Sequence, residues 1–243
     1  MKEKAYKVLA LQLGISNKKA KELIDRGLVY AGGKKVLIAR GEIDTKTKFK
    51  VKETNPVKKI FEDENIIAVD KPAHISSEEI EKESGAKLLH RLDKETSGVL
   101  LLVKNEEFRK RAIEEFRKGR VFKEYIAWVQ GIVAEETKID LPILTDKKGH
   151  RARSRISYSK GKEALTTITP LEIAAKKTKV KAVIKTGRTH QIRVHLSRID
   201  HPIIGDTYYS GPEYERVMLH AKKIELLGYS FEAPQPKEFE KFI

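Results

Sequence analysis

The residues best suited to chemistry lie in one short stretch, residues 90–98, which reads His-Arg-Leu-Asp-Lys-Glu-Thr-Ser-Gly. Five apolar residues, 99–103, follow at once, a pattern that indicates a polar loop held in place by a buried strand. Asp93 is the candidate catalytic residue, because a carboxylate can act as a nucleophile or assist the removal of a proton. Taken alone, the stretch is more safely interpreted as an ordinary turn at the start of a strand.

The charge balance narrows the classes of partner. Lys and Arg total 50 against 35 Asp and Glu in 243 residues, which gives a net charge of +15. Such an excess is typical of proteins that bind polyanions. Nucleic acid is favoured over a membrane, because the longest apolar run, residues 99–103, is far too short to cross a bilayer. With no cysteine and no secretory signal after the first residues, the sequence predicts a cytoplasmic protein, by default a monomer, without disulfides or thiolate metal sites.

Two short helices are predicted near the N-terminus. Apolar residues recur at helical spacing from Tyr6 to Leu13 and stop at Gly14, and Ser16 can cap a second helix that ends before Gly27. Basic residues gather on the outward side of the second helix and at every second position of a predicted strand over residues 46–52. An ordinary solvated face explains any single lysine equally well, but aligned rows favour phosphate contact. The candidates are Lys18, Lys21, Lys46, Lys48 and Lys50.

Residues 4–52 resemble the small RNA-binding module, of the alpha-L type, found in a ribosomal small-subunit protein and in several RNA-modifying enzymes. The resemblance rests on Leu-Gly-Ile-Ser at 13–16, the apolar spacing of the second helix and Gly-Gly-Lys at 32–34. Glu-Thr-Asn-Pro at 53–56 then breaks the pattern. We therefore predict an RNA-binding module over residues 1–53, a linker over 54–59 and a larger domain over 60–243.

The larger domain is predicted to mix helices and strands. Ser76 and Glu79 form a capping box for a short helix to about residue 83, and Asn105 can cap a longer helix that ends at Lys118. Thr189 can cap another short helix. Strands are predicted over residues 66–69, 121–129, 165–169, 180–185 and 219–226.

A strongly basic segment, residues 147–162, holds seven Lys and Arg and no acidic residue. It is either a flexible surface loop or a pair of strands that grips an RNA backbone, and the sequence leaves both open. The candidates for RNA contact in this segment are Arg151, Arg153 and Arg155.

Four histidines raise the hypothesis of a metal site, yet His190 and His195 are five residues apart and no glutamate lies between them as in metalloprotease helices. The sequence also lacks the glycine-rich loops that bind nucleotide phosphates. We therefore predict no metal and no cofactor, and any chemistry must come from side chains.

The larger domain resembles the RluA-type pseudouridine synthases. Its segments follow that family's order at residues 90–93, 96–98, 123–127, 161–164, 187–195, 205–209 and 219–221. The resemblance implies an α+β catalytic domain with a long, largely antiparallel, bent mixed sheet flanked by helices, and a central RNA cleft. One departure concerns residues 73–85, where Ala-His-Ile leads into an acidic helix in place of the family's usual glycine-rich stretch.

The resemblance also implies roles for individual residues. Asp93 would be the catalytic aspartate, Tyr125 the aromatic residue against the target base, and Arg193 the partner of the Asp93 carboxylate. Arg91 would help to push the target nucleotide out of its helix. Other candidates for RNA contact in the matching segments are Arg188 and His190.

The activity expected from this resemblance is the conversion of uridine to pseudouridine in structured RNA. The reaction breaks the glycosidic bond, turns the base and rebonds it through a ring carbon, and it needs no cofactor. An adjacent guanidinium favours the ionised carboxylate, but covalent attack and elimination both stay open. Large-subunit ribosomal RNA is the preferred substrate and transfer RNA the alternative. A non-catalytic RNA-binding or ribosome-assembly factor and a base-releasing glycosidase are the rival functions.

Overall fold

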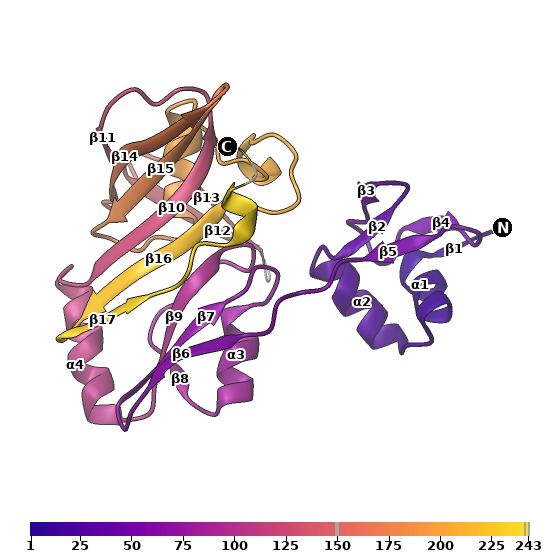
Figure 1. The fold of residues 1–243 in the computed structure, drawn as a ribbon, viewed down its shortest axis with the longest axis horizontal. Coiled ribbons are helices and arrows are strands. Elements are labelled where there is room, and N and C mark those ends of the chain that lie inside the picture. The colour runs from indigo at the N-terminus through magenta and orange to yellow at the C-terminus, as the bar shows by residue number, and fades with distance from the viewer. Residues whose placement is uncertain (149–150, 241, 243) are drawn as a thin grey trace. The chain divides into compact units, whose positions relative to one another are not determined.

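The computed structural model describes residues 1–148, 151–240 and 242. The chain divides into two units, Met1–Pro56 and Val57–Ile243, each with its own apolar core (Figure 1). Within the described ranges, no helix combines the length and the apolar character needed to cross a membrane.

The first unit packs two helices against short strands. Helix α1 ends at Gly14, which has a φ of 64°, and helix α2 begins at Ser16, whose side chain accepts a hydrogen bond from the Lys19 amide. The two predicted helices and their boundaries are thus confirmed. The elements are α1 (Ala5–Leu13), α2 (Asn17–Asp25), β1 (Lys2–Lys4) paired with β4 (Glu42–Asp44), and β2 (Val29–Ala31) between β3 (Lys34–Lys35) and β5 (Phe49–Val51).

The predicted strand over residues 46–52 is shorter than expected. Strand β5 covers only Phe49–Val51, and Lys46 and Lys48 lie in the turn before it. Asp44 causes this turn, because its side chain accepts a hydrogen bond from the Lys46 amide at 2.8 Å. The lysines therefore form an exposed cluster on a turn and one strand, not a row along a single strand.

The second unit is built on one mixed sheet, which confirms the α+β prediction. Among the described residues ten strands join it, in the order β11-β14-β15-β10-β16-β9-β7-β6, with β8 beside β9 and β17 beside β16. All of its pairs are antiparallel except β16 with β9. The strands are β6 (Lys58–Glu62), β7 (Ile66–Lys71), β8 (Lys87–Leu88), β9 (Ser97–Val103), β10 (Phe122–Gln130), β11 (Thr137–Asp140), β14 (Leu165–Ala174), β15 (Lys177–Ile184), β16 (Leu219–Leu226) and β17 (Tyr229–Glu232).

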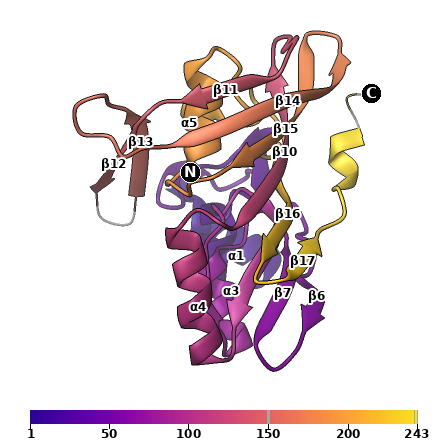
Figure 2. The same ribbon diagram turned by 90° about the vertical axis from the view of Figure 1, so that its left-hand side faces the viewer.

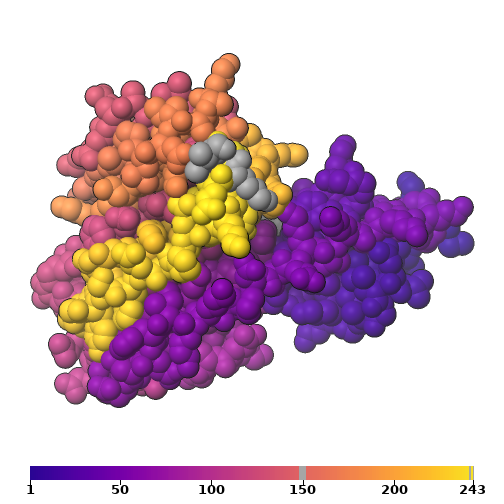
Figure 3. All heavy atoms as spheres, viewed as in Figure 1, coloured from indigo at the N-terminus to yellow at the C-terminus, as the bar shows by residue number. Residues whose placement is uncertain are grey.

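Strand β16 lies between β9 and β10, although it comes much later in the chain than either. Figure 3 shows the yellow C-terminal segment between the purple and orange parts of this unit. Its register with β9 pairs Ala221 with Gly98. A Cβ atom at Gly98 would lie 2.1 Å from the Ala221 carbonyl oxygen, so only glycine permits this approach.

Strand β9 is buried along its whole length, as predicted. Val99 and Leu101 pack in the core that includes Phe108 of α4 (Glu106–Arg117), whereas Leu100 and Leu102 pack in the core that includes Ile80 of α3 (Ser77–Ser84). The predicted caps at Ser76 and Asn105 are confirmed. The helical elements of this unit are α3 (Ser77–Ser84), α4 (Glu106–Arg117), α5 (Gln191–Arg198), η1 (Thr207–Tyr209) and η2 (Lys237–Glu240).

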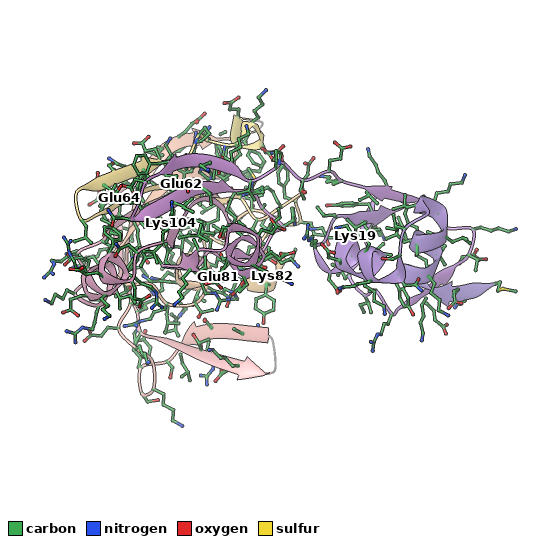
Figure 4. The ribbon with its side chains drawn as sticks, turned by 90° about the horizontal axis from the view of Figure 1, so that it is seen from below. Lys19, Glu62, Glu64, Glu81, Lys82 and Lys104 are labelled. Carbon is green, nitrogen blue, oxygen red and sulfur yellow. The ribbon has the colours of Figure 1, made fainter. Side chains whose placement is uncertain are left out.

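An ion pair ties the edge of the sheet to the end of β9. The Lys104 ammonium, just after β9, lies 3.0 Å from a carboxylate oxygen of Glu62 on β6 (Figure 4). Both side chains are partly exposed, so solvent screens the pair and its contribution to stability is small.

The basic segment forms a strand pair. Strands β12 (Ile143–Lys148) and β13 (Arg151–Ile156) make a separate antiparallel hairpin that projects from the body of the unit (Figure 2). Its base is anchored in a small apolar cluster that contains Ile143, Ile156, Val194 and Tyr209. This anchor explains why so basic a segment is ordered in the described residues.

Candidate active site

The loop that carries Asp93 is held on both sides by buried polar groups. On one side, Ser77 at the start of α3 accepts a hydrogen bond from the Leu92 amide and donates one to the Leu92 carbonyl, both at 3.1 Å. On the other side, the His74 amide donates to the Lys94 carbonyl at 2.8 Å. Both neighbours of Asp93 are therefore fixed, which preorganises its carboxylate.

Lys71 at the end of β7 reinforces this loop. Its side chain is fully buried, and its ammonium donates to the backbone carbonyls of Pro72, Ile75 and Lys94. Burial lowers the pKa of Lys71 to about 7. The three carbonyls use all three donors of the protonated amine, which makes Lys71 a bracket between β7 and the Asp93 loop.

Arg193 joins two carboxylates. Its Nη1 atom lies 3.1 Å from Asp93 Oδ2, while Nε and Nη2 donate to the two carboxylate oxygens of Asp206 at 2.7 and 2.8 Å. Burial alone would lower the pKa of Arg193, but the hydrogen bonds and charge of Asp206, with a smaller effect of Asp93, raise it above its ordinary value. Arg193 is therefore a fixed cation whose planar fork is aligned by Asp206 and whose free edge faces Asp93.

Tyr125 on β10 faces the same space. Its strand neighbours are Ala182 of β15 and Ala221 of β16, and beside it the register with β16 shifts by one residue. Burial raises the pKa of the Tyr125 hydroxyl, and the negative charge of Asp93 raises it further. The side chain is thus a neutral aromatic group close to the carboxylate.

Helix α5 begins differently from the prediction. Its N-cap residue is His190, not Thr189, and His190 has a left-handed φ of 55° with no side-chain cap. The imidazole turns inward instead: Nδ1 lies 2.8 Å from the Tyr209 hydroxyl, and Nε2 lies 3.8 Å from Asp93 Oδ2. The expectation that Thr189 caps this helix is therefore wrong.

These side chains line one pocket. The pocket is partly open to solvent, so a nucleotide can enter it from outside. Arg91 lies at its rim and pairs with Glu78 at 2.6 Å, and Arg188 donates to the Glu163 carbonyl at 2.9 Å. The lining includes Arg91, Asp93, Thr96, Tyr125, Arg188, His190 and Arg193.

The other basic candidates are not among the residues that line this pocket. Arg153 and Arg155 are exposed on β13, where Arg155 pairs with Asp146 at 3.0 Å, and the side chain of Arg151 lies outside the described part of the structure. In the first unit, Lys21 lies over the ring of Tyr6 at 4.2 Å. The remaining candidates there are exposed: Lys18, Lys46, Lys48 and Lys50.

The histidines considered for a metal site have partners within the protein. His195 bonds the Thr166 hydroxyl and the Leu141 carbonyl, and His90 accepts from the Leu101 amide. His220 bonds the Ser97 hydroxyl. In the described ranges no group of three or more His, Asp and Glu side chains is arranged to hold a metal.

Two residues of the site were missed from the sequence. Asp206 carried a signal, because it stands in the segment 205–209 that matches the family, but no role was assigned to it. Lys71 had little sequence signal, since Asp-Lys-Pro at 70–72 has the ordinary composition of a strand end. The pairing of Asp206 with Arg193 depends on the fold between them, which no local pattern encodes.

Comparison with known proteins identifies the class. A family model described as RNA pseudouridylate synthase matches residues 65–198. An uncharacterized RNA pseudouridine synthase of Helicobacter pylori is 57% identical over 242 residues, covering 98% of this chain and 99% of that protein. The dual-specificity RNA pseudouridine synthase RluA of Escherichia coli is 32% identical over 205 residues, covering 74% of this chain and 93% of that protein.

A solved structure shows the same fold. Human RNA Pseudouridylate Synthase Domain Containing 1 superposes with a TM-score of 0.65 at 29% identity, covering 76% of this chain and 84% of that one. The chain belongs to the RNA pseudouridylate synthase family. Within it, these relatives and the ordered motifs identify an RluA-type enzyme, an isomerase that acts on RNA.

Proposed function

We propose that Asp93, Tyr125 and Arg193 are the catalytic residues that convert uridine to pseudouridine in structured RNA. The observation that carries this assignment is the Arg193 to Asp93 contact of 3.1 Å on the wall of a pocket that Tyr125 also lines. A charged pair, an aromatic face and an open volume are what a flipped nucleotide requires.

The reaction is an isomerisation, so the atoms must balance within the nucleotide. Asp93 either attacks the anomeric carbon or assists removal of a neighbouring sugar proton, and the bond from that carbon to the ring nitrogen breaks with its electron pair on the base. The base turns, and a ring carbon bonds to the sugar. That ring carbon then loses its proton and the released ring nitrogen gains one. In the elimination route Asp93 also returns the sugar proton, so in both routes its carboxylate is regenerated.

Each partner of Asp93 has a task in this scheme. Arg193 holds the carboxylate in its reactive position, and Asp206 prevents the guanidinium from rotating away. Tyr125 supplies a face against which the base can stack while it turns, and its neutral hydroxyl can hydrogen-bond to the base. Arg91 is available as a wedge, because its ion pair with Glu78 is exposed and easily exchanged for RNA.

We propose large-subunit ribosomal RNA as the substrate, modified in the cytoplasm by a monomer. The support is the separate N-terminal unit, which carries exposed lysines and suits a large folded RNA; we assign it RNA binding. We extend RNA binding to Arg188, Arg153, Arg155 and His190. Transfer RNA is the second candidate substrate.

The test compares wild-type protein with Asp93→Asn on total RNA from a strain that lacks the gene, followed by mapping of pseudouridine. New sites with wild type and none with Asp93→Asn are expected, and the class of RNA that carries them identifies the substrate. Glu95→Gln, in the same loop, is the matched control and should retain activity. Free uracil among the products would support a glycosidase, and no product with either protein would support a non-catalytic factor.

A further inference from the structure

Besides Arg193, the Asp93 carboxylate has a second neighbour, His190, which has no task in the reaction steps proposed above. The Nε2 atom of His190 lies 3.8 Å from Asp93 Oδ2, the same oxygen that Arg193 contacts at 3.1 Å. The other ring nitrogen is bonded, since Nδ1 lies 2.8 Å from the Tyr209 hydroxyl. His190 thus stands between the hydroxyl and the carboxylate.

The hydrogen bonds around Tyr209 determine which nitrogen of His190 carries the proton. The Tyr209 hydroxyl already accepts a hydrogen bond from the Ser154 amide at 3.0 Å, so its own hydrogen is available to His190 Nδ1. The opposite tautomer would place the lone pair of Nε2 against the Asp93 carboxylate, which is repulsive. The favoured tautomer has its proton on Nε2, directed at Asp93.

The backbone at His190 is strained, and its surroundings hold it there. A φ of 55° is unusual for a residue other than glycine. The next residue, Gln191, is buried and uses both ends of its amide: Oε1 accepts from the Thr186 hydroxyl and the Arg188 amide, and Nε2 donates to Leu165 and Thr166. Strain that is fixed so thoroughly points to a required position for the imidazole.

We propose that His190 is a positioning residue that donates a hydrogen bond from Nε2 to Asp93 Oδ2 when a nucleotide fills the pocket. Together with Arg193 it then holds one carboxylate oxygen and leaves Oδ1 as the atom that reacts with the substrate. This inference rests on the proposed function of Asp93. The gap of 3.8 Å in the unliganded site must close by about 1 Å, as catalytic hydrogen bonds commonly do on substrate binding.

A series of contacts leads from Ser154 through Tyr209 and His190 to Asp93. It connects the β12–β13 hairpin to the carboxylate that we propose as the reactive group. Ser154 lies on β13 between Arg153 and Arg155, and its amide is the first link to Tyr209 and His190. An RNA that engages the hairpin therefore binds the same strand that fixes the imidazole.

Two substitutions at His190, each of which replaces one ring nitrogen by an amide group, distinguish the proposed positioning role from a purely structural one. In His190→Gln the amide nitrogen replaces Nε2 and can still donate to Asp93, whereas in His190→Asn the side chain reaches only the position of Nδ1. Asparagine tolerates the left-handed backbone better than glutamine. A merely structural role therefore predicts that His190→Asn is the better enzyme, and our proposal predicts the reverse.

The assay uses full-length protein and total RNA from a strain that lacks the gene. His190→Asn should lower kcat by about 100-fold with little change in KM, as expected for a displaced reactive group, and His190→Gln should recover most of that loss. Tyr209→Phe should lower kcat by about tenfold, and Tyr208→Phe, at the adjacent tyrosine, is its control. Equal kcat values for the two His190 variants would overturn the proposal.

A second measurement does not depend on turnover. Nitrogen NMR of the wild-type protein labelled in histidine, assigned by difference with His190→Gln, should show the His190 proton on Nε2, and Tyr209→Phe should alter that signal. A proton on Nδ1 would overturn the proposal even if the substrate RNA were wrongly assigned. If wild type forms no pseudouridine but the proton lies on Nε2, the proposed function fails while the assigned tautomer stands.

Discussion

Arg193 divides its guanidinium between two carboxylates of unequal burial. Asp206 is 1% exposed and takes two hydrogen bonds, whereas Asp93 takes one and keeps an open side toward the pocket. A carboxylate that must react cannot also be the anchor of a buried cation. Asp206 neutralises and orients Arg193, while Asp93 keeps a side open to the pocket, as the role we propose for it requires.

The substitution Asp206→Asn should therefore lower both stability and activity, although Asp206 does not line the pocket. Loss of the buried charge leaves Arg193 partly uncompensated, and we expect unfolding free energy to fall by about 3 kcal/mol, with kcat reduced as well. Urea denaturation and the assay of pseudouridine formation measure the two effects. Glu95→Gln is the control, because Glu95 lies 4.0 Å from Arg193 and is half-exposed. Equal effects of both substitutions would contradict the division of roles.

Tyr125→Phe should separate turnover from binding. We expect kcat to fall by about tenfold or more while RNA affinity changes little, because one hydroxyl at the flipped base contributes little to a surface dominated by phosphate contacts. Since burial and Asp93 raise the pKa of Tyr125, the wild-type rate should show no loss near pH 10 from ionisation of this hydroxyl. Single-turnover kinetics with filter binding tests the first point. An unchanged kcat would show that the Tyr125 hydroxyl takes no part in the reaction.

The sequence predicted which side chains share the pocket better than it predicted the residues that hold them in place. Asp93, Tyr125 and Arg193 were recognisable because they stand in ordered motifs, and the structure brings them to one pocket. Asp206 and Lys71 act through contacts with residues distant in sequence or with backbone carbonyls. Such contacts arise only after folding, so residue type and spacing did not reveal which groups these two residues contact.

The β12–β13 hairpin carries two exposed arginines, Arg153 and Arg155, that we propose as contacts for RNA phosphates. Arg153→Gln with Arg155→Gln should reduce the slope of log affinity against log salt by about 1 to 2, because each arginine that no longer neutralises a phosphate releases about one counterion fewer. Arg155 pairs with Asp146, so its share should be the smaller. Binding of RNA across a range of salt concentrations gives the slope. A slope equal to that of wild type would show that this hairpin does not contact phosphate.

Elements with local signals were predicted and elements without them were not. The helices after Ser16, Ser76 and Asn105 were found because capping side chains mark them in the sequence. Short strands such as β8 and β17 lack a long enough alternating pattern to be recognised. Helix α5 was found, but its start was misplaced because His190 caps it through strained backbone and not through a side chain.

At the scale of the whole molecule, buried histidines link stability to pH. Burial lowers the pKa of His90 to about 4 and that of His220 to about 3, so both stay neutral in the folded state over most of the acidic range. In the unfolded chain they bind protons below about pH 6.5. Their contribution to stability is therefore complete above about pH 6.5 and declines as pH falls toward the folded values.

We expect the free energy of unfolding to fall by roughly 1.2 kcal/mol per histidine between neutral pH and about pH 5.5, before most carboxylates protonate. Urea denaturation at several pH values between about 5.5 and 7.5 measures this slope. His90→Gln should remove about half of the part due to these two residues. The same slope in wild type and in His90→Gln would contradict the assignment.

The position of β16 also governs when the enzyme can become active. Strands β9 and β10 carry the Asp93 loop and Tyr125, yet the strand between them, β16, leaves the ribosome later than both. A nascent chain that ends before residue 219 lacks the strand that sets their spacing. Sheet completion must therefore await residues 219–226, and the long sequence separations of these pairings favour slow folding. The arrangement delays RNA modification until β16 has been synthesised.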